Sequence, residues 1–176
     1  LARGFFIPPK GWKPAERVAS ATEVLFTDTK GKIIADSGCK RSVAGTKWHE
    51  ETRQWMKELG LQPVREECHE KFRFGDGKVV PAIGAWKYPC GIHGRNGVLS
   101  VAEVAQDCPP LLSVEGMSDM GVVMDFGRRK VTVEKRERDM EKLPSGHPVL
   151  RLDEYGEVSD FSQEFLTLTA GTADET

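Results

Sequence analysis

Short apolar runs separated by turn signals cover the middle of the chain. Residues 23–26 (Glu-Val-Leu-Phe) and 32–35 (Lys-Ile-Ile-Ala) flank residues 28–31, which have turn composition. This pattern predicts a hairpin whose second strand ends at Asp36. A second hairpin is predicted at residues 72–80, because Asp-Gly between two β-type runs favours a tight turn in which both turn residues take a positive φ.

Helical periodicity is limited to two short segments. An amphipathic helix is expected to begin at Thr46 and to end before Gly60, with apolar residues at i, i+7, i+8 and i+11. These residues are Trp48, Trp55, Met56 and Leu59. A second helix is expected from about residue 113 to 120, and strands at 98–104, 122–126 and 130–133. Because the helices are few and short, the predicted fold class is mainly β.

Composition divides the chain into three parts. Residues 1–21 contain three prolines and an excess of basic residues, and we interpret them as a flexible, Pro-containing arm. Residues 22–134 carry the dense strand and turn signals of one domain. Residues 135–176 are predicted to form an acidic, flexible extension, because residues 141–176 contain eight acidic and two basic residues. The charged run at 134–138 indicates the solvated face of a helix.

Length and charge set limits on function. The chain has 176 residues and a formal net charge of −2, which fits one domain and argues against a dedicated nucleic-acid binder. No apolar run approaches the roughly 20 residues of a membrane-spanning helix, so no membrane partner is expected. The four cysteines are dispersed and no secretory signal is visible, which indicates reduced thiols in an intracellular, cytoplasmic protein.

The tripeptide Asp36-Ser37-Gly38 is the main candidate for chemistry. It follows the apolar strand predicted at 32–35. A carboxylate at this point can be held on a tight turn that glycine permits, and the Ser37 hydroxyl is left to hydrogen-bond to a partner loop. Alone the tripeptide is a weak signal, because the same residues are ordinary in turns.

Three stretches, taken in order, resemble the retropepsin-like aspartic proteases, and most closely the protease regions of copia-type retrotransposon polyproteins. They are residues 33–39 with Asp36-Ser37-Gly38-Cys39, the glycine-tipped segment 72–78, and residues 111–117 followed by 121–126. The resemblance covers residues 22–134. It implies the closed β-barrel of the acid proteases, assembled as a homodimer.

The resemblance also implies a mechanism. Asp36 of one chain would face Asp36 of a second chain, since the sequence contains no second Asp-Ser/Thr-Gly. Two adjacent carboxyls share one proton, so the ionised one activates water and the protonated one stabilises the developing oxyanion. The implied substrate is an extended peptide of the retrotransposon polyprotein, cleaved by aspartic endopeptidase chemistry without a metal or cofactor.

Roles for further residues follow from the same resemblance. Ser37 would lock the two active loops together, and Gly38 would allow their turn. The tip of a flap over the peptide would be Phe74, Gly75, Asp76, Gly77 and Lys78. Pocket or structural positions would be Cys39, Leu111, Leu112 and Ser113. Cys39 stands where a small Ala is common, and its thiol could make activity sensitive to oxidation. Ser113 stands where many retroviral members have Gly.

Other interpretations stay open at this point. The chain could be a catalytically silent retropepsin-like module for dimerisation or peptide binding, or a small β domain unrelated to proteases. A zinc site could be supplied by Cys68, His69, Cys90, His93 and Cys108, but their spacing matches no paired Cys-x-x-Cys arrangement. His49 is expected at the surface of its helix and His147 in a loop, neither beside a nucleophile.

Overall fold

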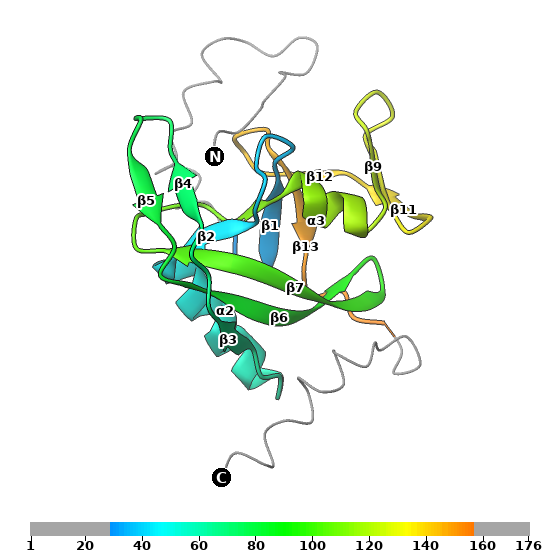
Figure 1. Cartoon of the computed structure of the whole chain (residues 1–176). Coiled ribbons are helices and arrows are strands. Elements are labelled where there is room, and N and C mark those ends of the chain that lie inside the picture. The colour runs from blue at the N-terminus through cyan, green and yellow to red at the C-terminus, as the bar shows by residue number, and fades with distance from the viewer. Residues whose placement is uncertain (1–28, 157–176) are drawn as a thin grey trace.

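The computed structural model describes residues 29–156 and shows a mainly β fold with two helices (Figure 1). This confirms the predicted fold class. The predicted arm at 1–21, the predicted strand at 23–26 and residues 157–176 lie outside the described residues. Among the described residues, no helix is long and apolar enough to cross a membrane.

Eight strands form the main sheet, in the order β12-β13-β1-β8-β2-β7-β6-β3. They are β1 (Lys32–Ala35), β2 (Val43–Gly45), β3 (Val64–Glu66), β6 (Gly84–Ile92), β7 (Arg95–Val104), β8 (Leu111–Leu112), β12 (Glu141–Lys142) and β13 (Pro148–Arg151). The edge strands β12 and β3 do not pair with each other. The sheet is therefore open in the described part of the chain, which corrects the expected closed barrel. Edge strands of two and three residues offer few backbone groups for closure.

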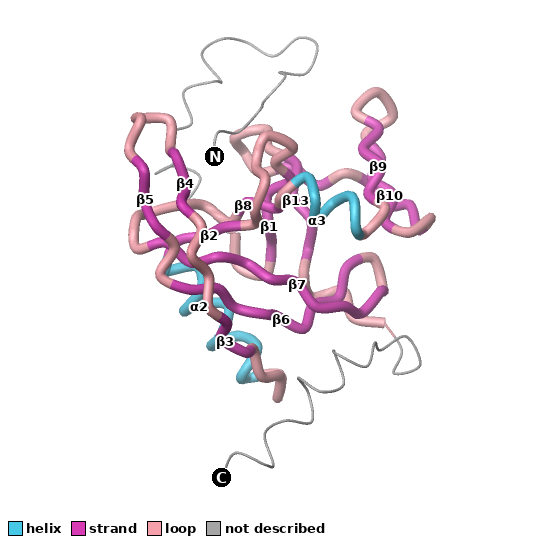
Figure 2. The backbone as a smooth tube through the Cα atoms, in the orientation of Figure 1, coloured by secondary structure: helices cyan, strands magenta, loops and turns pink. Residues whose placement is uncertain are grey.

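Two smaller sheets extend from the main one (Figure 2). One is the hairpin of β4 (Lys71–Arg73) and β5 (Val79–Pro81), as predicted; the other contains β9 (Val122–Asp125), β10 (Lys130–Val133) and β11 (Arg136–Asp139). The β4–β5 turn differs in detail from the prediction. Gly77 has φ +84° and its N–H donates to the Phe74 carbonyl (2.9 Å), whereas Asp76 has no positive φ. One glycine in the left-handed region thus completes a three-residue loop.

The first predicted helix is α2 (Thr46–Glu58), and the second is α3 (Val114–Asp119). Gly45 rather than Thr46 is the N-cap of α2, because the Thr46 hydroxyl donates to Glu103 Oε2 (2.8 Å). Both helices end before a glycine of positive φ, at Gly60 and Gly121. Glycine adopts this left-handed backbone conformation without strain, so the chain can turn away at the end of each helix.

His49 on α2 is fully buried, which corrects its expected place at the surface. Its Nε2 lies 2.9 Å from the Ala102 carbonyl, so Nε2 carries the proton and donates it there. Nδ1 then accepts from the Tyr88 hydroxyl at 2.5 Å. Burial lowers the His49 pKa to about 4, so the imidazole is a neutral part of the core.

The acidic extension predicted from residue 135 belongs, as far as it is described, to the fold. β13 pairs antiparallel with β1, and Ile33 and Ile34 lie opposite Leu150 and Val149. The domain boundary predicted at 134 is therefore wrong. The short apolar run of β13 pairs with β1 in the main sheet, although acidic residues flank this run in the sequence. The charged run is also corrected, since Glu134 and Lys135 (φ 45° and 69°) form the turn between β10 and β11.

Alternate residues of the strands enter two separate apolar clusters, as expected for a sheet covered on both faces. Ile33 packs in the cluster that includes Trp48 and Met56 of α2. Ile34 packs in a second cluster with Cys39 and with Phe72 of the β4–β5 hairpin. The hairpin therefore lies over the face of the sheet that contains the residues flanking Asp36.

Candidate active site

Asp36 lies directly after β1, at the point where this strand leaves its parallel partner β8. Its N–H donates to the Leu112 carbonyl (3.1 Å), and its own carbonyl accepts from the Cys39 N–H (3.0 Å). The Gly38 N–H donates to Asp36 Oδ1 (2.9 Å). The carboxyl group, whose residue is 3% exposed, is thus held on a tight turn by the backbone around it.

The strand β8 consists of Leu111 and Leu112 and lies beside the end of β1 that leads into this turn. Ile34 and Ala35 lie opposite Leu111 and Leu112 in the parallel register. Both leucines are buried, and their side chains belong to the two apolar clusters. They are residues of the core.

Ser113 connects the end of β8 to the loop after Asp36. Its N–H donates to Ser42 Oγ (3.0 Å), and the Ser42 hydroxyl donates back to Ser113 Oγ (3.2 Å). Ser113 Oγ also accepts from the Gly116 N–H (3.0 Å) and so caps α3. A glycine at 113 would keep the backbone N–H bond but would lose the two bonds that the hydroxyl oxygen accepts, so the serine has a local structural reason. Ser42 was missed by the sequence analysis, because nothing in its local pattern distinguishes it.

Cys39 is fully buried beside Asp36, and its thiol donates to the Arg41 carbonyl (2.9 Å). Burial, followed by the charge of Asp36, raises the Cys39 pKa to about 11. Burial, Cys39 and Asp36 likewise raise the pKa of Cys108. Both groups therefore stay protonated thiols at neutral pH, and burial protects Cys39 from the oxidation that its position suggested.

Arg41 ties the loop after Asp36 to the base of the β4–β5 hairpin. Its guanidinium donates to the carbonyl and hydroxyl oxygens of Ser100 (both 2.8 Å) and lies 3.7 Å from the Glu70 carboxylate. The backbone carbonyl of Glu70 accepts a hydrogen bond from the Ala82 N–H (2.8 Å), across the base of the hairpin. The predicted tip residues Gly75–Lys78 are exposed and Phe74 is half-buried.

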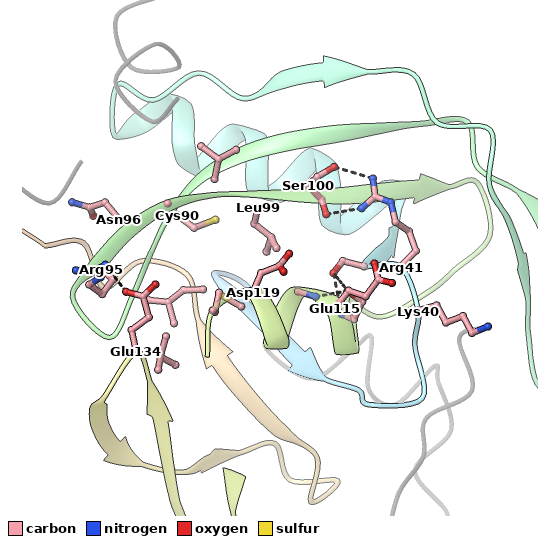
Figure 3. Close-up of a pocket in the computed structure, with 18 of the residues that line it drawn as sticks. Lys40, Arg41, Cys90, Arg95, Asn96, Leu99, Ser100, Glu115, Asp119 and Glu134 are labelled. Atoms are coloured by element: carbon pink, nitrogen blue, oxygen red, sulfur yellow. Dashed lines mark hydrogen bonds and ion pairs between the residues drawn. The ribbon is translucent and has the colours of Figure 1, made fainter. Parts of the chain in front are cut away.

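A cavity of about 550 Å³ lies between β7 and α3 (Figure 3). Cys90, Leu99 and Met120 give it apolar walls, and Glu115 and Asp119 rise from α3 at its edge. Of the predicted site residues, Ser113 lines this cavity. Asp36, Ser37, Gly38, Cys39, the hairpin tip, Leu111 and Leu112 do not line it.

The cysteines are free thiols; Cys39, Cys90 and Cys108 are buried and Cys68 is half-buried. In the described part of the chain, no group of three or more His, Cys, Asp or Glu side chains is arranged to hold a metal ion. His93 Nδ1 donates to the Arg136 carbonyl (3.0 Å), and His69 faces Glu67 at the surface. The residues of the zinc alternative therefore have separate surroundings.

No protein-family model matches the chain, and no curated protein matches it either. Among solved structures, the chain is similar to the retroviral protease-like domain of Ddi1 from Leishmania major, with 12% sequence identity and a TM-score of 0.38. The match covers 61% of this chain and 86% of that one.

Proposed function

We propose that the chain is a retropepsin-like aspartic endopeptidase that works as a homodimer and cleaves a retrotransposon polyprotein in the cytoplasm. The observation that carries the proposal is the setting of Asp36. A buried carboxyl stands at the end of β1, beside the parallel strand β8, and its Oδ1 accepts the Gly38 N–H at 2.9 Å. A backbone N–H aimed at a carboxylate fixes its orientation and favours its charged form.

A dimer follows from the number of such loops. The sequence holds one Asp-Ser-Gly, so a pair of carboxyls needs a second copy of the chain, related by a two-fold axis. Ser37 is exposed at the turn, where it is free to contact the equivalent loop. The paired Asp36 carboxyls would share one proton, and the ionised one would activate a water against the peptide carbonyl.

The β4–β5 hairpin is the flap in this proposal. Phe72 anchors it in the same cluster as Ile34 and Cys39, while its glycine tip stays exposed. Arg41 adds a polar link from the Asp36 loop to Glu70. An extended peptide between tip and loops would bind as an added strand, with backbone hydrogen bonds supplying affinity.

The test is processing of a longer precursor that carries this domain, followed between pH 4 and 7. Asp36→Asn should abolish processing, because the amide cannot activate water. Asp139→Asn is the matched control, since Asp139 is exposed on β11 and its change should leave the rate unaltered. At low protein concentration, the rate should rise with the square of the monomer concentration.

The alternative is the silent module for dimerisation or peptide binding. It predicts that the precursor is folded and dimeric but is not cleaved at any of these pH values, either with the native sequence or as the Asp36→Asn variant. Cleavage that persists in Asp36→Asn would refute the aspartic mechanism itself.

A further inference from the structure

We propose that His147 is a positioning residue for the Asp36 carboxyl: the two residues lie at the same end of the β1–β13 pair, and protonation of His147 keeps Asp36 ionised in acid. This inference rests on the proposed function. It concerns a histidine that the sequence analysis placed in a loop and gave no role.

The strand register brings the two residues together. β13 runs antiparallel to β1, and Ile33 lies opposite Leu150 and Ile34 opposite Val149. Asp36 directly follows β1 and His147 directly precedes β13, so both residues lie at the same end of the strand pair. Directly opposed residues of an antiparallel pair project to the same face, and that face contains Ile34 and Val149 of the second apolar cluster.

Hydrogen bonds of the β12–β13 loop hold His147 in place. The His147 carbonyl accepts the Leu143 N–H (2.9 Å), and the Gly146 N–H donates to the Leu143 carbonyl (2.8 Å). Leu143 is itself buried in the second cluster. The imidazole Nδ1 lies 2.7 Å from the Ser145 hydroxyl, which can donate to a neutral ring and accept from a protonated one.

Among the described groups, the Asp36 charge acts to raise the pKa of three, and of these His147 is the one that acid can protonate. Cys39, Cys108 and His147 all sense the Asp36 charge, but the two thiols stay neutral because burial and Asp36 raise their pKa. For His147, burial lowers the pKa and the Asp36 charge opposes that change. By linkage, a protonated His147 must lower the pKa of the Asp36 carboxyl by the same interaction.

The first experiment needs no catalysis. The pKa of each histidine is measured by NMR titration of the full chain and of its Asp36→Asn variant. Removing the carboxylate should lower the His147 pKa by about one unit or more, the effect of a charge within about 10 Å at an effective dielectric near 20. His69 is the internal control, because its exposed side chain faces Glu67 and should titrate identically in both proteins. An unchanged His147 pKa would overturn the proposal.

The second experiment follows processing of the precursor against pH. His147→Gln keeps a hydrogen-bonding side chain but cannot be charged, so the acid limb of the profile should move up by about one pH unit. Ser145→Ala is the matched control, since it removes the partner of Nδ1 and keeps the titratable ring. An acid limb that is the same in His147→Gln and the native protein, or that moves equally in Ser145→Ala, would show that His147 is only structural.

The two outcomes are separable from the proposed function. If Asp36→Asn abolishes processing while His147→Gln leaves the profile unchanged, the protease stands and the role of His147 is refuted. If the native precursor is never processed but the His147 pKa falls in Asp36→Asn, the protease is refuted, and the electrostatic pairing of the two residues is retained.

Discussion

At Gly91, two stretches of backbone meet with no space for a side chain. The Gly91 N–H donates to the Leu152 carbonyl (2.8 Å), and its carbonyl accepts the Glu154 N–H (2.9 Å). A Cβ at this position would lie 2.4 Å from the Tyr155 Cα. The residues after β13 are thereby fastened to β6 within one chain.

We therefore expect Gly91→Ala to lower the free energy of unfolding by about 1–3 kcal/mol, because the obstacle is backbone that cannot rotate away. Urea denaturation measures this loss. Gly97→Ala is the matched control: it lies in β7 of the same hairpin, and a Cβ there would meet nothing within 4 Å. Equal losses in the two variants would mean that the close approach at Gly91 does not limit stability.

The four thiols differ in reactivity for a physical reason. Cys68 is half-buried, whereas Cys39, Cys90 and Cys108 are buried. With its pKa raised to about 11, Cys39 is a thiolate in only about one molecule in a thousand at pH 8. With a chromogenic disulfide reagent, we expect one fast thiol per native chain and three more after unfolding. Cys68→Ser should remove the fast phase, and a fast phase that persists would contradict the burial of the other three.

Among the elements, the β4–β5 hairpin depends on one glycine. Gly77 has φ +84°, while Gly75 at the same tip has no positive φ, and neither has an atom within 4 Å of an added Cβ. Gly77→Ala should therefore cost about 1 kcal/mol of local strain, and Gly75→Ala should cost less.

Hydrogen exchange detects this difference. The hydrogen bonds of the tip, from Gly77 N–H to Phe74 and from Phe74 N–H to Lys78, should open about fivefold more often in Gly77→Ala. The main sheet should exchange as before. Equal exchange at the tip in both variants would show that the turn tolerates a side chain at residue 77.

β13 is an element on which the whole sheet depends. Its partner β1 carries Asp36 at its end, and Val149, Leu150 and the adjacent Leu152 are buried. Burying three such side chains stabilises a domain by about 5–9 kcal/mol, comparable with its entire stability. A chain that ends at residue 134 should therefore be unfolded by circular dichroism, whereas one that ends at 156 keeps all the described strands. A folded chain ending at 134 would restore the domain boundary inferred from composition.

At the scale of the molecule, the sequence revealed what depends on local pattern. β1, the β4–β5 hairpin, α2 and α3 follow from apolar spacing and from Gly60, Gly77 and Gly121. β6 was missed, because Pro89 and Gly91 look like breakers. Yet β3 pairs only with Ala85–Lys87 of β6, so the missing N–H of Pro89 interrupts no ladder on that side.

The surroundings of the candidate site needed long-range pairing. That Asp36 follows an apolar strand is visible in the sequence, but that β13 lies beside this strand is not. Acidic composition concealed β13, and the burial of His49 against Tyr88 and Ala102 depends on a sheet that the helix pattern alone does not reveal. The same holds for His147, since the pairing of β13 with β1, and not the local sequence, brings this residue to the end of β1 that Asp36 follows.

The buried His49 makes the stability of the whole molecule depend on pH. Its pKa is about 4 in the folded chain and about 6.5 when unfolded. Between these values the unfolded chain binds more protons than the folded one, so the free energy of unfolding falls as pH is lowered from about 6.5 to 4. The full loss from this residue is about 3 kcal/mol. Urea denaturation at pH 7.5 and pH 4.5 measures it.

His49→Gln should be less stable at pH 7.5, because the Tyr88 hydroxyl loses its imidazole partner, but it should lose much less stability on acidification. His69→Gln is the matched control, since the His69 side chain is exposed beside Glu67 and lies outside the core that His49 occupies. If His49→Gln loses as much unfolding free energy in acid as the native chain does, the loss comes from other groups. Half-buried His147, whose pKa is lowered, acts in the same direction.

The proposed protease must work in this pH range, so its acid limit combines the protonation of Asp36 with the unfolding that protonation of His49 drives. If activity falls at a higher pH than the pH at which the urea midpoint falls, the protonation of Asp36 and not unfolding sets the acid limit.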